Sequence, residues 1–526
     1  MTTTFASKSA STVASSSAAD HNLYTALLAA FPTDREAVAV ETDGGLRYSW
    51  RDLDEASAMV ANLLAFLDLP PGARVAAQVD KSVEALVLYL ATLRAGLVYL
   101  PLNTAYQSGE MEYFLGDAKP ALLVCTGRNF GWLSKMAFLA GTQHVFSLND
   151  DRTGTLLERA ARFPRSHTPV PRAADDLAAI IYTSGTTGRS KGAMLSHGNL
   201  LSNARVLQTY WDWQEGDVLI HALPIFHVHG LFVAIHGALI NGSTMLWCAK
   251  FDPQTALRLM ARATVFMGVP TLYVRLLAEA GLTREATRSI RLFVSGSAPM
   301  LVDTHRQWQA RTGQTILERY GMSETVMLTS NPCKTADGDR LVGTVGQPLP
   351  GVELRVRDEA GQTLPAGQTG GIEVRGPNVF LGYWQMPEKT AQEFTDDGFF
   401  KTGDVGFVDA NGYVTIVGRS KDLIISGGYN VYPAEIEGYL NNLPGVEESA
   451  VVGVPDADFG EVGVAVVVPK AGQALHGPDL VAALKGRLAN FKVPKRCVVV
   501  DALPRNAMGK VQKNLLRAEY SAPAAA

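Results

Sequence analysis

Short apolar segments alternate with helical patterns along most of the chain, and this alternation limits the fold more than any other feature. From Leu23 onward, strand-like apolar runs are followed by stretches of helical length, such as the apolar-faced stretch at 83–93 before Gly96. Repeats of this kind predict α/β layers with mostly parallel sheets, which bind ligands at the carboxyl ends of their strands. The expected strands lie at residues 74–79, 121–125, 177–181, 217–221, 243–247 and 291–295.

The pattern changes after about Pro350, where Gly and Asp turns separate short strands of antiparallel type. These strands are expected at 352–357, 371–375 and 412–417, and a smaller C-terminal region is expected to have strands at 449–454 and 462–468 and helices near 480–488 and 511–520. The predicted domains are a disordered leader at 1–20, a large N-terminal domain at 21–418, a hinge at 419–421 and a small C-terminal domain at 422–526.

The composition excludes several classes of protein. Hydrophobic residues make up 47% and charged residues 19% of the 526 residues, which is typical of globular proteins. With 47 Lys and Arg against 51 Asp and Glu, the net charge of −4 gives no reason to expect nucleic acid or a membrane as a partner. The four cysteines are far apart, and the Ser-rich first twenty residues contain no apolar signal core and no arginine, so we expect a cytoplasmic protein with reduced thiols.

The most distinctive segment is YTSGTTGRSKG at 182–192, which directly follows the apolar run at 177–181. Its glycines let backbone N–H groups approach an anion closely, and its hydroxyl groups and Lys191 add donors and a positive charge. A loop of this composition after a buried strand suits a polyphosphate. Its spacing differs from the G-x-x-x-x-G-K-[ST] P-loop, so the mechanism of that loop does not transfer.

This segment resembles the phosphate loop of the adenylate-forming superfamily, which includes acyl-CoA synthetases, aryl-CoA ligases, luciferases and the adenylation domains of peptide synthetases. Four further segments resemble motifs of that family and occur in its order: YGMSET at 320–325, KTGD at 401–404, GRSKD at 418–422 and PRNAMGK at 504–510. The resemblance implies an α/β fold, with a large N-terminal domain of layered sheets plus a β-subdomain. A hinge joins this domain to a small, mobile α+β C-terminal domain.

The resemblance also implies the chemistry. A carboxylate attacks the α-phosphate of ATP, with Mg²⁺ as cofactor, and coenzyme A then displaces AMP. Since both first reactants are anions, cations and N–H donors must surround the α-phosphate. Lys510 is the implied catalytic lysine of this step and a candidate for reversible acetylation by an acetyltransferase and a deacetylase. The implied ligands are, for the phosphates, Thr183, Ser184, Gly185, Thr186, Thr187, Gly188, Lys191 and Ser323; for Mg²⁺, the catalytic Glu324; for the ribose, Asp404 and Arg419; and for the pantetheine path, Gly428.

Ser323 differs from the usual residue of the family, and Lys421 is implied in the motion of the small domain. The family usually has threonine where Ser323 stands, but the hydroxyl group is kept. Lys421 corresponds to the residue about which the small domain rotates between the two half-reactions. Rotation is implied because Lys510 must leave the site before coenzyme A can enter.

The acyl pocket decides which acid is used. By resemblance its walls include His227 in ALPIFHVHG, which borders the reacting carboxylate, Ser297 in SGSAP, and the segment GVPTLYVR that ends at Arg275. Arg319 stands directly before the YGMSET motif, where aryl-CoA ligases typically have glycine. A guanidinium that faces an apolar pocket is costly unless an anion neutralises it. The second carboxylate of a short diacid would do so through a bidentate pair with Arg275 or Arg319.

Short dicarboxylates are therefore the predicted substrates, and within the family the chain resembles the malonyl-CoA synthetases, so malonate and methylmalonate are the expected acids. An ion pair of either arginine with a protein acid such as Glu318 stays open, and it would favour a medium-chain or aryl acid. A carrier-protein enzyme and a nucleotide-sensing scaffold fit less well, because no carrier domain follows Lys510 and because Lys510, Glu324 and the glycine loop are all present.

Overall fold

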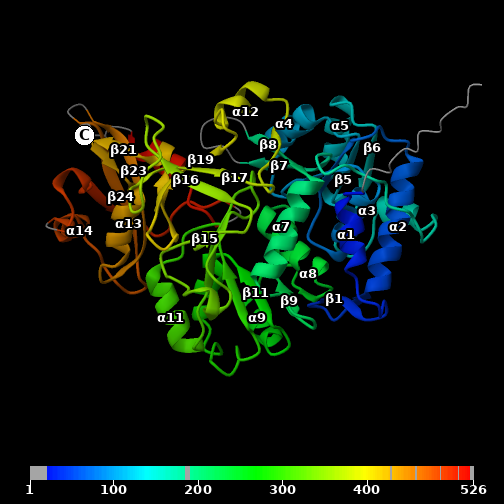
Figure 1. Cartoon of the computed structure of the whole chain (residues 1–526), viewed down its shortest axis with the longest axis horizontal. Helices are drawn as coiled ribbons and strands as arrows, with labels where there is room; N and C mark the ends of the chain where they lie inside the picture. The colour runs from blue at the N-terminus through cyan, green and yellow to red at the C-terminus, as the bar shows by residue number, and fades with distance from the viewer. Residues whose placement is uncertain are drawn as a thin grey trace, which may run out of the picture.

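The computed structural model of the chain describes residues 20–183, 190–426, 429–456, 459–485, 487–506 and 509–521. Two large sheets with their helices form most of the molecule, an antiparallel sheet lies beside them, and a small domain lies at one end (Figure 1). This architecture confirms the predicted α/β class with a β-subdomain and a small α+β C-terminal domain. The predicted leader at 1–20 lies outside the described residues except for Asp20.

The sheet that precedes the glycine loop, sheet I, is parallel in its centre and antiparallel at one edge. Its strands, in spatial order, are β18 (Gly382–Tyr383), β8 (Lys191–Ser196), β7 (Leu177–Thr183), β4 (Val98–Pro101), β3 (Arg74–Gln78), β5 (Leu122–Cys125) and β6 (His144–Ser147). The middle five residues of β7 are all buried, as expected for a strand covered on both faces. The strand ends at Thr183, where the predicted phosphate loop begins.

The second large sheet, sheet II, has the same mixed character. Its strands, in spatial order, are β15 (Gln347–Pro348), β14 (Thr329–Ser330), β13 (Leu317–Tyr320), β12 (Leu292–Ser295), β11 (Val265–Gly268), β9 (Val218–His221), β10 (Thr244–Trp247), β1 (Val38–Thr42) and β2 (Arg47–Ser49). The strands from β13 to β1 run parallel. Their carboxyl ends therefore share one edge, and that edge carries Arg319, Ser297 and the segment with His227.

Helices connect and cover these strands. They are α1 (Leu23–Ala29), α2 (Trp50–Phe66), α3 (Val83–Arg94), α4 (Ser108–Ala118), α5 (Phe130–Leu139), α6 (Thr155–Ala160), α7 (His197–Tyr210), α8 (His236–Ile240), α9 (Pro253–Met260), α10 (Pro270–Leu277), α11 (Val302–Thr312) and α12 (Pro387–Glu393). Every residue of α3 is buried, and a fully buried π-helix, His229–Ile235, precedes α8. In the described ranges, no helix combines the length and the apolar character needed to cross a bilayer.

The antiparallel β-subdomain and the small domain follow in sequence. The subdomain strands are β16 (Glu353–Arg357), β17 (Gly370–Arg375), β19 (Phe400–Val408) and β20 (Val414–Arg419). The small domain, orange to red in Figure 1, contains β21 (Ile424–Ser426), β22 (Tyr429–Val431), α13 (Pro433–Asn441), β23 (Val446–Asp456), β24 (Gly460–Pro469), α14 (Gly477–Leu484), β25 (Arg496–Val499) and α15 (Lys513–Ser521). Its apolar side chains form two clusters of their own on either side of the β23–β24 pair.

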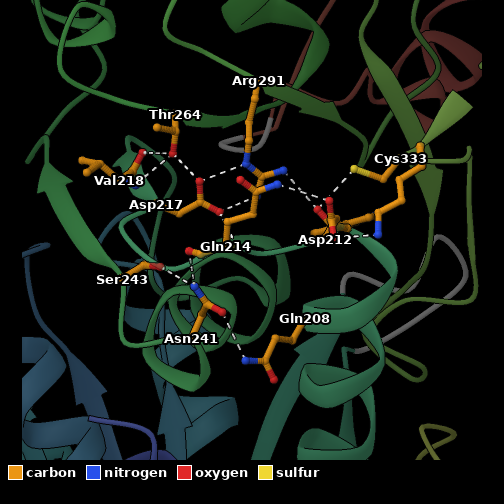
Figure 2. Close-up of polar contacts among 12 residues, drawn as sticks. Gln208, Asp212, Gln214, Asp217, Val218, Asn241, Ser243, Thr264, Arg291 and Cys333 are labelled. Atoms are coloured by element: carbon orange, nitrogen blue, oxygen red, sulfur yellow. Dashed lines mark hydrogen bonds and ion pairs between the residues drawn. The ribbon is translucent and has the colours of Figure 1, made fainter. Parts of the chain in front are cut away.

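A polar network fixes sheet II at the edge opposite the candidate site (Figure 2). Asp217, Thr264 and Arg291 directly precede β9, β11 and β12. The Asp217 carboxylate accepts from Arg291 Nε at 2.9 Å and from the Thr264 hydroxyl at 2.7 Å. Since the ion pair is largely buried, it is charge-assisted and little screened, and it aligns the amino ends of three neighbouring strands. The carboxyl ends of the same strands are thereby held in register.

The strands expected from the sequence agree with the structure to within one or two residues at most ends. The expected helix at 480–488 lies earlier, at Gly477–Leu484, because Pro478 occupies its first turn, where the missing N–H of proline costs nothing. The expected helix at 511–520 begins at Lys513. These shifts leave the order of elements as predicted.

Candidate active site

Asp404, Arg419 and Tyr320 form a polar group beside the end of β13. Asp404 and Arg419 lie opposite each other in the β19–β20 pair, and Arg419 Nε is 2.8 Å from Asp404 Oδ1. The Tyr320 hydroxyl donates to Asp404 Oδ2. Asp404 is buried, and an ionised carboxylate keeps spare lone pairs on both oxygens for further donors. The two residues predicted to bind ribose are therefore adjacent.

Glu324 is buried next to this group and contacts Tyr383, whose hydroxyl donates to Glu324 Oε1 at 2.9 Å. The Lys191 ammonium lies 4.1 Å from the centroid of the Tyr383 ring. Burial raises the pKa of Glu324, and Tyr383, Arg419 and Lys191 act against that rise. A buried carboxylate that is pushed toward its neutral form gains most from a bound cation, so the site fits Mg²⁺ together with the phosphates of ATP.

The segment that carries Ser323 and Glu324 has an unusual backbone. Val326 is fully buried with φ of +56°, a left-handed conformation that β-branched residues rarely adopt. A Cβ added at Gly321 would lie 1.9 Å from the carbonyl oxygen of Val326, so only glycine fits there. Ser323, between them, is half-buried. Backbone strain of this kind is concentrated at functional sites.

Lys510 comes to the site from the small domain. It follows Gly509, whose φ of +73° favours glycine, and a Cβ at Gly509 would lie 3.3 Å from Thr271 Oγ1 in α10. The Lys510 side chain reaches solvent. Partial burial of its ammonium group lowers the pKa of Lys510, the charge of Arg419 lowers that pKa further, and the charge of Asp404 raises it. Lys510 is therefore close to Asp404 and Arg419, and its loop contacts the large domain at Thr271.

A second contact joins the two domains on the same side. Lys470 Nζ, after β24, lies 3.8 Å from Asp303 Oδ2 in α11. Both side chains are about half exposed, so the pair contributes little stability by itself. Together with the Gly509–Thr271 contact, it shows that the small domain meets the large domain at helices α10 and α11.

Arg319 is the most unusual charge in the site. Its side chain is 3% exposed, and Nε and Nη2 are buried without a hydrogen-bond partner among the residues that the structure describes. Burial lowers the pKa of Arg319 to about 9, so the guanidinium stays charged at neutral pH. Glu318, the acid considered as its partner, instead lies with Oε1 2.6 Å from His305 Nε2. Neighbouring strand residues point to opposite faces, which keeps Glu318 away from Arg319.

Two histidines lie near this guanidinium. Burial lowers the pKa of His227 to about 4, with Arg319 and Lys510 acting in the same direction. Burial and Arg319 also lower the pKa of His229 well below its ordinary value. Ser297 Oγ lies 3.4 Å from His229 Nδ1. Both imidazoles are thus neutral at pH 7, and His227, His229, Ser297 and Arg319 lie in one region of the structure.

Arg275 is not part of that group. It was expected to face an apolar pocket, but its side chain is exposed on α10 and forms no ion pair among the described residues. The reason is helical periodicity, because α10 begins at Pro270 and buries Leu272, Tyr273 and Leu276, which leaves Arg275 on the outer face.

Several predicted ligands lie outside the described residues. These are Ser184, Gly185, Thr186, Thr187 and Gly188 of the phosphate loop and Gly428 of the pantetheine path. Thr183 and Lys191 are the predicted ligands of this loop that the structure describes, and the Thr183 hydroxyl donates to the Lys191 carbonyl at 3.4 Å. In the described part of the chain, no cluster of three or more His, Cys, Asp or Glu side chains could hold a metal ion by itself.

Four residues with evident contacts in the site were not predicted from the sequence. Tyr383 contacts Glu324, Thr271 faces Gly509, and His229 and Gly296 lie beside Arg319. His229 and Gly296 stand inside the segments quoted for the acyl pocket, so their positions were visible. The sequence does not show which side chains contact one another in the site.

Two protein families match the chain over most of its length. Residues 26–384 match the AMP-binding enzyme family, and residues 435–510 match the AMP-binding enzyme C-terminal domain. Among solved structures, ATP-bound MatB from Rhodopseudomonas palustris is 55% identical, with a TM-score of 0.93 over 96% of this chain and 99% of that one. For apo MatB the identity and coverage are the same, but the TM-score is 0.83. The overall structure therefore resembles the ATP-bound structure more closely.

The curated relatives include enzymes with different acids in their names. Malonate–CoA ligase from Arabidopsis thaliana is 35% identical over 478 residues, which are 85% of this chain and 78% of the relative. Feruloyl-CoA synthase from an Amycolatopsis species is 35% identical over 484 residues, which are 91% of this chain and 95% of the relative. Identity at this level does not distinguish a diacid from an aryl acid, so the pocket must do so.

Proposed function

Because the chain belongs to the AMP-binding enzyme family, we propose that it is an AMP-forming acid–thiol ligase that joins malonate, and also methylmalonate, to coenzyme A. Malonate and ATP form malonyl-AMP and pyrophosphate, and the thiol of coenzyme A then displaces AMP to give malonyl-CoA. The name of the Arabidopsis relative supports malonate as the acid.

The observation that carries the choice of acid is the unpaired guanidinium of Arg319. It is buried and charged at neutral pH, and no described residue pairs with its Nε or Nη2. By resemblance, His227 is a neighbour of the reacting carboxylate. Burial is the main cause that lowers the pKa of His227, and the charge of Arg319 is the next, so the imidazole and the guanidinium are close to each other. A short acid that places one carboxylate at His227 brings a second one to Arg319. Malonate, with one carbon between its acids, meets that condition.

A second set of residues is proposed to bind the nucleotide. The loop from Thr183 to Lys191 holds the phosphates with Ser323, and Asp404 and Arg419 hold the ribose. Glu324 holds Mg²⁺, which supplies positive charge to the phosphates when it is bound. The buried Glu324 beside Tyr383 and the adjacent pair Asp404–Arg419 support these roles.

Lys510 stabilises the negative charge that moves between the substrate carboxylate and the α-phosphate. Its nearness to Asp404, Arg419 and His227 supports this role. The hinge at 419–421 between a large domain at 21–418 and a small domain at 422–526 then lets Lys510 leave before coenzyme A enters. The separate apolar clusters of the small domain support that division.

Two further proposals concern the cell. Acetylation of Lys510 by an acetyltransferase would remove the adenylation charge, and a deacetylase would restore it. A cytoplasmic location is proposed because the four cysteines are free thiols, as is usual in a reducing compartment.

The alternative is a ligase of the same family that acts on another short, medium-chain or aryl acid, as the name of the feruloyl-CoA synthase relative says of that protein, and the malonate–CoA ligases among the relatives do not favour it. Pyrophosphate release should be measured with acetate, malonate, methylmalonate, succinate, octanoate and coumarate for the native protein, Arg319→Ala and Arg275→Ala. We expect malonate to be preferred by about 100-fold or more, since a neutral-tailed acid leaves the guanidinium unpaired. A native preference for octanoate or coumarate would overturn the proposal.

A further inference from the structure

The guanidinium of Arg319 occupies the space of a side chain that Gly296 lacks. Gly296 follows β12 and is buried, and a Cβ built on it would lie 2.4 Å from Arg319 Nη1 and 2.5 Å from Cζ. The three atoms nearest to that Cβ all belong to Arg319. Gly296 is not among the residues with positive φ, so its backbone would accept alanine. Glycine is needed here for space and not for conformation.

His229 presents a second unpaired nitrogen beside Arg319. It is 1% exposed, and its buried Nε2 has no hydrogen-bond partner within the described ranges. Its Nδ1 lies 3.4 Å from the Ser297 hydroxyl. When that hydroxyl donates to Nδ1, the proton of the neutral ring is on Nε2, which makes Nε2 a free donor.

The backbone around His229 and Ser297 is closely constrained. His229 opens the π-helix, and His221 Nε2 lies 2.9 Å from the carbonyl oxygen of the next residue, Gly230. A Cβ at Gly230 would lie 2.0 Å from the Pro224 carbonyl, so this turn is tightly packed. Ser297 has φ of +72°, a costly conformation for a residue with a side chain. Helices of this kind and strained residues are frequent at functional sites.

Arg319 Nε, Arg319 Nη2 and His229 Nε2 are thus three buried nitrogens in one region for which the described part of the chain supplies no partner. Proteins rarely leave buried polar groups unpaired, and a group of donors without an acceptor points to an anion that arrives with the substrate. The field of Arg319 also acts on the His229 ring, which shows that the two groups are near each other. An ionised carboxylate has enough lone pairs to accept from all three nitrogens.

We propose that Gly296 and His229 determine the specificity for a diacid. Gly296 leaves the space in which the Arg319 guanidinium lies, and His229 donates its Nε2–H to the same distal carboxylate that Arg319 binds. This inference rests on the proposed malonate activity and extends it to the residues that reject monocarboxylates. An acid of equal length without the second carboxylate leaves all three donors unpaired, and is rejected for that reason.

The role of His229 is tested by the ratio of kcat/KM for malonate to that for propionate. In His229→Leu we expect the malonate value to fall roughly 10- to 100-fold, the usual effect of losing a hydrogen bond to a charged group, while the propionate value changes less than about threefold. His229→Gln, whose amide nitrogen can take the place of Nε2, should recover most of the malonate activity. If the role of His229 were purely structural, kcat/KM would fall equally for both acids, and the Gln and Leu variants would have the same activity.

The role of Gly296 is tested by a double-mutant cycle with Arg319. Gly296→Ala should lower kcat/KM for malonate about tenfold or more in the native background but less than about twofold in Arg319→Ala, because the alanine methyl then has room. The matched control is Gly116→Ala in α4, where an added Cβ meets nothing within 4 Å. This control variant should leave kcat/KM unchanged for both malonate and propionate.

The outcomes separate this inference from the function on which it rests. A native protein that prefers propionate to malonate overturns both. The inference alone is overturned if the native protein prefers malonate but two other results are found. These are additive effects of Gly296→Ala and Arg319→Ala, and an equal fall in kcat/KM for both acids in His229→Leu. Should Gly296→Ala fail to fold, which thermal unfolding will show, the His229 pair of variants decides the result.

Discussion

Replacing Arg319 by methionine should make the protein more stable and less selective at the same time. Burial lowers the pKa of this guanidinium to about 9, from an ordinary value of about 12.5 or more. At about 1.4 kcal/mol for each tenfold change in a proton equilibrium, the difference corresponds to roughly 5 kcal/mol of unfavourable charge burial. Methionine has a similar length and no charge, and after relaxation of the site we expect the free energy of unfolding to rise by about 1–3 kcal/mol.

The assay combines thermal unfolding with pyrophosphate release. Native protein should be stabilised by added malonate, whereas Arg319→Met should be more stable without malonate and show no further gain with it. Its kcat/KM for malonate should fall about 100-fold or more, and its preference for malonate over propionate should disappear. The matched control is Arg275→Met on the exposed face of α10. We expect it to change the free energy of unfolding by less than about 0.5 kcal/mol and to leave the preference for malonate unchanged. An Arg319→Met protein that is less stable than the native one, or that still selects malonate, would refute the reasoning.

The remaining predictions concern the two half-reactions. Lys510→Ala and the acetyl-mimicking Lys510→Gln should each slow adenylation by about 100- to 1,000-fold, yet leave the reaction of preformed malonyl-AMP with coenzyme A within a few fold; equal losses in both steps would contradict the role of Lys510. Thr271→Phe should block the approach of Gly509 and lower pyrophosphate exchange about tenfold without changing the coenzyme A step, and unchanged exchange would count against docking at Thr271. Because burial raises the pKa of Glu324, protonation competes with Mg²⁺ as the pH falls, so the acid limb of adenylation should move to lower pH when Mg²⁺ is raised. His227, with a pKa of about 4, should add no acid limb above about pH 5, and a Mg²⁺-independent limb near pH 6 would show that another group titrates.

The arrangement of the sheets was predictable because local pattern alone encodes it. The run at 177–181 is apolar at every position, and the structure buries it on both faces in β7. The strand expected at 217–221 is β9 at Val218–His221, and the helix expected at 83–93 is α3 at Val83–Arg94. In each case the burial that a residue needs is set by its immediate neighbours in sequence.

The two arginines show where such reasoning succeeds in principle and fails in practice. Arg275 could have been placed correctly from the sequence, since Pro270 marks the start of a helix whose buried face is Leu272, Tyr273 and Leu276. The Glu318 alternative for Arg319 could also have been weakened, because adjacent residues of a strand point to opposite faces. The partner that Glu318 does have, His305 in α11, depends on packing between distant segments.

Other features of the site have no local signal. Nothing near Val326 predicts a left-handed valine, since the strain is imposed by the packing of Gly321 against its carbonyl. The contact between Gly296 and Arg319 depends on the register of β12 with β13, in which Ser295 lies opposite Glu318. Register of this kind is fixed by the whole sheet, so the sequence alone does not show which glycine makes room for which side chain.

The most direct test is the structure of the protein with malonate and a non-hydrolysable ATP analogue. We expect the distal carboxylate within hydrogen-bond distance of Arg319 Nε or Nη2 and of His229 Nε2, with the other carboxylate near His227 and Lys510. A structure in which malonate lies elsewhere, while Arg319 is paired with an acid of the protein itself, would contradict the proposal that an unpaired buried guanidinium selects the diacid.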